Sequence, residues 1–190
     1  MERIATAVYD ANILYSAPLR DLFVRLAQAG LVRARWTDDI HEEWLRNVLK
    51  NNPQIAPERL ARTRTLMNEA VRDCLVTGYQ DSIASLSLPD PDDRHVLAAA
   101  IRAGAEVIVT FNLRHFPTQT LSPFDIEALH PDDFLLSLLE LAPGTVCTAV
   151  KRQRENLRNP PKTAEELLTT LESQGLTQTV SRLREFIDLL

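Results

Sequence analysis

Short apolar runs alternate with helical patterns in the first part of the chain. Residues 4–9 (IATAVY) form an apolar run that ends at Asp10, and residues 31–36 (LVRARW) alternate apolar and polar side chains. Both patterns are typical of β-strands. Between them a helix is predicted from Pro18 to Gly30, because proline suits the first helical turn and glycine a helix end.

The same alternation continues to about residue 112. The predicted elements of this part are helices over 39–50, 57–74 and 94–103 and strands over 75–79 and 106–112. Thr37 is suited to cap the first of these helices, and Gly104 is suited to end the last. Alternating strands and helices indicate an α/β fold with a central parallel sheet and helices on both faces.

From residue 131 onward the pattern predicts helices only. The helical segments are 131–141, 144–158, 163–174 and 176–190, and Gly175 separates the last two. We therefore expect an α/β domain over residues 1–130 and a C-terminal helical extension over residues 131–190.

Composition places the chain among globular proteins. It has 190 residues, of which 45% are hydrophobic and 25% charged, a balance that excludes general disorder. No apolar run approaches about 20 residues, so a membrane span is excluded. Cys74 and Cys147 match no metal or redox spacing and are expected to be reduced, buried thiols. These features predict a soluble, cytoplasmic protein.

Polar side chains from distant segments are predicted to meet at one edge of the sheet. Asp10 ends the first strand, Glu43 lies early in the helix after the second, Asp93 precedes the helix over 94–103, and Asn112 follows the strand after it. Ligands bind outside the carboxyl ends of strands in open parallel sheets. These four residues are therefore the candidate site.

Simpler alternatives exist for each acid. Asp10 fits an Asx-turn after a strand, and Asp93 fits a helix N-cap with Asp90 and Asp92 as solvated turn residues. A helical wheel places Glu42 and Glu43 equally well beside the apolar stripe of their helix, so spacing does not choose between them.

Clustered carboxylates indicate a particular chemistry. Acids brought together raise each other's pKa unless a cation compensates, and oxygen ligands select hard ions such as Mg²⁺ or Mn²⁺. Such ions bind phosphate oxygens and support hydrolysis of phosphodiesters. The net charge of −5 disfavours a general polyanion binder, but bound cations would offset part of it at such a site. Phosphoryl transfer to Asp10 is the nearest competitor.

Three separated segments resemble the PIN-domain ribonucleases, in particular the VapC-like toxins of toxin-antitoxin pairs. They are VYDANILYSA, WTDDIHEEW and LPDPDDRHVLAAAIRAGAEVIVTFNLRHF. The helices after residue 131, beginning HPDDFL, resemble the extension of one PIN toxin subgroup. The resemblance implies a three-layer α/β/α sandwich plus C-terminal helices. It also implies an endoribonuclease dependent on Mg²⁺ or Mn²⁺, with RNA as substrate and a cognate antitoxin and a second copy of the chain as partners.

The family pattern also assigns the site residues. It places the metal-binding acids at Asp10, Glu43 and Asp93, and the choice of Glu43 follows from its spacing after Thr37. Asn112 matches the asparagine of the family segment TxNxxDF and is predicted to orient a ligand or water. Hydrolysis at such a site is expected to leave a 5′-phosphate and a 3′-hydroxyl.

One position departs from the family pattern. His115 stands where many members carry a fourth acid. Either it weakens a second metal site and favours Mn²⁺ over Mg²⁺, or it is only a surface loop residue. By the same resemblance, Ser16 is a candidate to contact a carboxylate or the phosphate, and a plain helix-leading serine is the alternative.

Two other functions remain open on sequence grounds. The departure at His115 is consistent with a catalytically silent PIN-like module that binds RNA or protein. An aspartyl phosphatase of the haloacid type would use Asp10 as nucleophile, but Asn12 and Ile13 replace the residues that its motif requires. Zinc is not supported, because His41, His95 and His130 fit no common zinc spacing.

Overall fold

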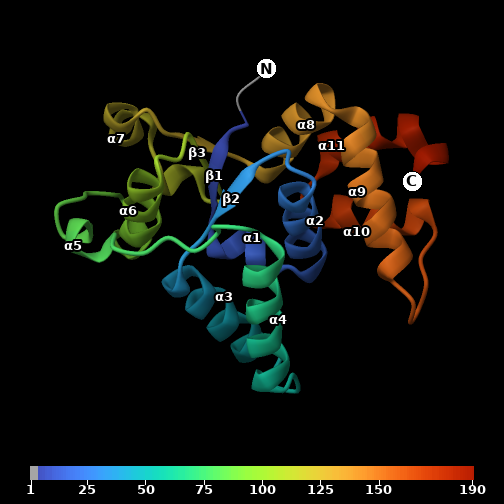
Figure 1. The fold of residues 1–190 in the computed structure, drawn as a ribbon, viewed down its shortest axis with the longest axis horizontal. Helices are drawn as coiled ribbons and strands as arrows, with labels where there is room; N and C mark the ends of the chain where they lie inside the picture. The colour runs from blue at the N-terminus through green and yellow to red at the C-terminus, as the bar shows by residue number, and fades with distance from the viewer. Residues whose placement is uncertain (1–3) are drawn as a thin grey trace.

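The computed structural model describes residues 4–190 and contains a parallel sheet of four strands in the order β2-β1-β3-β4 (Figure 1). The strands are β1 Thr6–Tyr9, β2 Arg33–Arg35, β3 Val107–Val109 and β4 Glu127–Leu129. Every residue of β1 and β3 is buried. Burial on both faces is expected of central strands in a parallel sheet. The predicted α/β/α fold with a parallel sheet is confirmed.

Helices cover both faces of this sheet. They are α1 Ala11–Tyr15, α2 Ala17–Gln28, α3 Asp38–Asn51, α4 Pro57–Ala70, α5 Gln80–Ile83, α6 Arg94–Ala103 and α7 Thr118–Leu121, with 3₁₀ turns η1 Pro91–Asp93, η2 Leu113–His115 and η3 Ser122–Phe124. Helix α6 packs on β1 and β3, and α2 lies on the opposite side (Figure 1). Side chains alternate along a strand, and Tyr9 meets the ring of Phe23 from α2.

Local chemistry explains where the helices begin and end. Thr37 caps α3 by accepting a hydrogen bond from the Ile40 N–H. Helix α6 has the predicted bounds and ends at Gly104, whose left-handed backbone (φ 58°) suits glycine. Cys74 and Cys147 are buried and unpaired, as predicted.

The segment after residue 130 is helical, as predicted. It consists of α8 Pro131–Leu141, α9 Pro143–Asn156, α10 Ala164–Ser173, α11 Thr177–Leu183 and the 3₁₀ turn η4 Arg184–Leu189. Phe134 of α8 stacks on Phe23 with ring centroids 6.2 Å apart and meets Tyr9 edge-on. The buried core therefore runs across residue 130, and the division into domains at that residue stays a prediction.

One predicted strand was wrong and one strand was missed. Residues 75–79 form only an isolated bridge between Leu75 and Trp36, because Gly78 adopts a left-handed conformation (φ 71°) that breaks the extended chain. The fourth strand is instead β4, which the sequence analysis missed. At the sheet edge Glu127 is exposed and the next two residues are only partly buried, so β4 lacks the apolar run that marks a strand.

The strand order places a ligand-binding edge between β1 and β3. The chain goes from β1 to β2 on one side and later enters β3 on the other, so the order reverses there. Tyr9 pairs with Val109. Asp10 and Thr110, the next residue of each strand, are therefore neighbours at the carboxyl edge. Among residues 4–190, no helix is both long enough and apolar enough to cross a membrane.

Candidate functional site

Asp10 lies at this edge, where several hydrogen bonds fix its carboxylate. Oδ2 accepts hydrogen bonds from Asn12 Nδ2 at 2.6 Å and Thr110 Oγ1 at 2.7 Å, and Oδ1 accepts one from the Ala11 N–H at 2.6 Å. Asp10 is also the N-cap of α1, but its carboxylate accepts from the Ala11 N–H and the Asn12 side chain rather than in an Asx-turn. Only 2% of the residue is exposed. The carboxylate is therefore held in one orientation before any ligand arrives.

Asn12 and Thr110 join the two strand ends. Asn12 Nδ2 donates to Thr110 Oγ1 at 3.0 Å, and Asn12 Oδ1 accepts from the Phe111 N–H at 3.3 Å. The same Thr110 oxygen accepts from the Asn112 N–H at 3.0 Å. The sequence analysis missed Thr110. Thr110 could have been identified because it directly follows the predicted strand VIV, just as Asp10 follows the first strand, so both lie at the same edge of the sheet.

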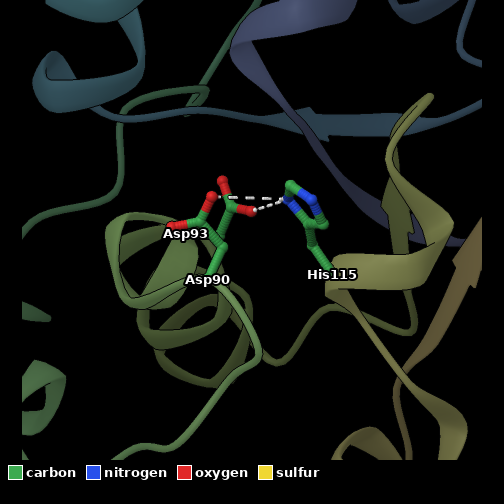
Figure 2. Close-up of side chains that lie close together, drawn as sticks. All are labelled: Asp90, Asp93 and His115. Atoms are coloured by element: carbon green, nitrogen blue, oxygen red, sulfur yellow. Dashed lines mark hydrogen bonds and ion pairs between the residues drawn. The ribbon is translucent and has the colours of Figure 1, made fainter.

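Asp93 and Asp90 face His115 across the start of α6 (Figure 2). His115 Nδ1 lies 2.7 Å from Asp93 Oδ2 and 3.7 Å from Asp90 Oδ2. Asp93 makes no capping hydrogen bond to α6, so the capping alternative for this residue was wrong. Asp90 instead caps η1 through the Asp92 N–H. The surface-loop alternative for His115 was also wrong, because it contacts one of the predicted acids.

Glu43 projects from α3 toward His95 of α6. Its Oε2 lies 3.5 Å from His95 Nε2. Burial lowers the pKa of His95, but the hydrogen bond and the charge of Glu43 outweigh it, and the net pKa is raised. Glu42 lines the same groove. Glu43, however, is the one whose charge raises the pKa of Asp10.

A groove of about 510 Å³ opens above these acids. The residues that line it are Asp39, Glu42, Glu43, Arg46, Asp90, Asp92, Asp93, His95, Asn112 and His115. It is therefore bounded by α3, by the start of α6 and by η2. Asn112 is exposed at its wall, where sequence analysis expected it.

The electrostatics of the site are those of crowded acids. Burial, followed by the charges of Glu43 and Asp93, raises the pKa of Asp10 to about 6, although the Thr110 hydrogen bond opposes the change. Burial also raises the pKa of Asp93 against the lowering effect of His115. A buried carboxylate with negative neighbours favours either a proton or a cation.

The predicted residues are brought together to different degrees. Within residues 4–190, the close group of possible metal ligands is Asp90, Asp93 and His115, whose ligand atoms lie within 4.8 Å of one another. Asp10 and Glu43 stand outside this close group and interact with Asp93 or each other through their charges. The donors are carboxylates and one imidazole, a set that suits Mn²⁺ and, through the carboxylates, Mg²⁺.

Comparison with known proteins agrees with this geometry. The PIN domain family model matches residues 6–114, which hold all four predicted site residues. The chain belongs to the PIN-domain family. The predicted resemblance is thereby confirmed. Residues 131–185 of this PIN-domain chain match a second model, the VapC50 C-terminal domain, in agreement with the predicted extension.

A bacterial relative extends the comparison. Over 97 residues the chain is 47% identical to a Mycobacterium tuberculosis (strain ATCC 25618 / H37Rv) protein named "Putative ribonuclease VapC50". The aligned part is 51% of this chain and 57% of the relative, so the match spans little more than half of either protein. No solved structure matches the chain.

In the presence of a chelator, the unfolding free energy of Asp10→Asn should depend less on pH than that of the wild type. The folded-state pKa of about 6 lies above the usual 3.8, so the protonated side chain favours the fold below about pH 4, and this advantage is lost as the pH rises through 6. The difference corresponds to about 3 kcal/mol of unfolding free energy. Urea unfolding of both proteins between pH 4 and pH 7 measures it. If the unfolding free energies of both proteins change with pH in the same way, the pKa of Asp10 is not raised in the folded protein.

Proposed function

We propose that this protein is a metal-dependent endoribonuclease and the toxin of a toxin-antitoxin pair. The observation that carries the proposal is the buried carboxylate of Asp10, influenced by the charges of Glu43 and Asp93 beside an open acidic groove. Membership of the PIN-domain family and similarity to a protein named as a ribonuclease support it. An acidic groove of this kind binds a polyanion only when cations neutralise it.

Asp10, Glu43 and Asp93 would hold the divalent cation. The fit rests on the oxygen donor set and on the raised pKa values of Asp10 and Asp93, which come first from burial and then from the charges of neighbouring acids. When bound, Mg²⁺ or Mn²⁺ offsets the charge of the scissile phosphate and polarises water and phosphate oxygens. His115 adds an imidazole beside Asp93, which favours Mn²⁺.

The neighbouring residues hold these acids for hydrolysis. Asn12 and Thr110 orient Asp10, and the imidazole of His115 orients Asp93. Asn112, exposed at the groove wall, is placed to orient RNA or water. Water adds to the phosphorus and the bond to the 3′ oxygen breaks, so the products carry a 5′-phosphate and a 3′-hydroxyl, with the proton passing to the leaving oxygen.

Basic side chains beside the groove would receive the RNA backbone. Arg46 lines the groove itself, and Arg114 lines an adjoining hollow with Asp90 and His115. Arginine contacts to phosphate position a nucleic acid without reading its sequence. The substrate phosphates would therefore pass between α3 and η2.

The predicted protein partners would use other surfaces. A groove of about 370 Å³ lies between α2 and α4, and Leu66 on its rim is 52% exposed. An apolar surface of this kind supports protein contact. This surface would suit the antitoxin or the second copy of the chain that the family resemblance implies. Location in the cytoplasm likewise stays a prediction.

Asp93→Asn should abolish cleavage of RNA while the fold is retained. The change removes a proposed ligand charge but keeps the side-chain shape, so a loss of at least about 100-fold in rate is expected. Total RNA incubated with Mn²⁺, with and without chelator, followed by mapping of the new ends, measures it.

The matched control for this experiment is Asp81→Asn. Asp81 is an exposed acid on α5 that does not line the groove, and its replacement should change the rate little. Wild-type protein that binds RNA but leaves it intact with Mn²⁺ would favour the silent binding module instead. Full activity of Asp93→Asn would remove that residue from the site.

His115→Asp should raise the cleavage rate with Mg²⁺ relative to that with Mn²⁺. The new carboxylate replaces a nitrogen donor with oxygen donors beside Asp93, which suits the harder ion. The ratio of the two rates, compared among wild type, His115→Asp and the neutral control His115→Asn, measures this effect. If the ratio is the same in all three proteins, His115 does not influence the choice of metal.

A further inference from the structure

The turn between α10 and α11 brings the C-terminal extension to the proposed active site. Ser16 Oγ donates a hydrogen bond to Gln174 Oε1 at 2.6 Å. At the next residue, a Cβ added to Gly175 would lie 3.1 Å from Cε1 of Phe111. Phe111 stands between Thr110 and Asn112, so the turn touches the segment that carries both site residues.

The position of this turn is fixed by a buried acid. Asp132 near the start of α8 is only 3% exposed and accepts hydrogen bonds from the N–H groups of Gln178 and Thr179, in the first turn of α11. Thr179 Oγ1 also donates to the Asp132 carbonyl. Because α8 begins shortly after β4, the start of α11 is tied to the carboxyl edge of the sheet. The two helices lie together beside the sheet in Figure 1.

The ring of Phe111 is held from two sides. His130 meets it edge-on with centroids 5.0 Å apart, and Gly175 lies against its Cε1 edge. The backbone N–H of Phe111 donates to Asn12 Oδ1. The ring thus belongs to the residue that joins Thr110, which orients Asp10, to Asn112, which lines the groove.

Only glycine fits this turn without disturbance. Gly175 has a φ of 95°, which side-chain-bearing residues rarely adopt. A Cβ at 3.1 Å from the ring is closer than ordinary van der Waals contact, so the ring would have to move. The close approach thus links the conformation of the extension to that of the segment 110–112.

We propose that Gln174 and Gly175 are positioning residues of the nuclease, and that the extension completes the active-site edge through them. The proposal rests on the proposed function for its catalytic readout. Ser16 is accordingly assigned to the contact with the extension rather than to the phosphate, since its hydroxyl is engaged by Gln174.

Gly175→Ala tests this proposal against the matched control Gly30→Ala. Gly30 also has a positive φ (76°), but a Cβ there meets nothing within 4 Å. Both variants should lose stability through backbone strain. Only Gly175→Ala should lower kcat, by about tenfold, with KM for RNA unchanged, because misplaced site residues slow the chemical step. Amide hydrogen exchange at Phe111 and Asn112 should also become faster in that variant alone.

A second change provides the rescue. Phe111→Leu removes the ring atoms that a Cβ at residue 175 would meet, so the double variant should have a kcat no lower than Phe111→Leu alone. Gln174→Ala removes the hydrogen bond to Ser16 without backbone strain and should lower kcat to a smaller extent. It tests the proposal even if Gly175→Ala fails to fold.

The outcomes separate the two proposals. Wild-type protein that cleaves no RNA would overturn the proposed nuclease function. Amide exchange at Phe111 and Asn112 would still test whether the turn at Gln174 and Gly175 positions this segment. Unchanged exchange in both Gly175→Ala and Gln174→Ala would overturn the positioning role. Unchanged kcat in both, with an active wild type, would do the same.

Discussion

The burial of a carboxylate beside other acids, at one edge of a parallel sheet, is the constraint on which this structure depends. Asp10 is almost fully buried, and its charged neighbours Glu43 and Asp93 raise its pKa further. Such a group stays buried when its carboxylate is well hydrogen-bonded and its charge is neutralised by a proton or a cation. Thr110 and Asn12 supply the hydrogen bonds, and a divalent cation is the ligand that the oxygen donors fit.

The rest of the chain holds this edge in place. The pairing of Tyr9 with Val109 sets Asp10 beside Thr110. The turn η1, directly before α6, places Asp93 in the groove that α3 and η2 also line. The C-terminal extension also contacts this edge of the sheet. Its buried Asp132 fixes the start of α11, and the turn before α11 rests on Phe111. Stability of the extension and geometry of the site are therefore linked.

The sequence predicted those features that depend on local patterns. Buried runs, proline starts and glycine ends gave the sheet and most helix bounds, and a residue that follows a strand is known to lie at its edge. What it missed depends on contacts between distant segments. The sequence placed Asp93 in the site, but its contact with His115 depends on how two distant segments fold together. The role of Thr110 needed the strand register, and the edge strand β4 has too little burial to leave a pattern.

Location of the cation tests this account most directly. Crystals grown with Mn²⁺ and measured on both sides of its absorption edge would show the ion by anomalous scattering. The account predicts a peak bounded by the carboxylates of Asp10, Glu43 and Asp93. A peak held only by Asp90 and His115, away from Asp10, or no peak at saturating Mn²⁺, would contradict it.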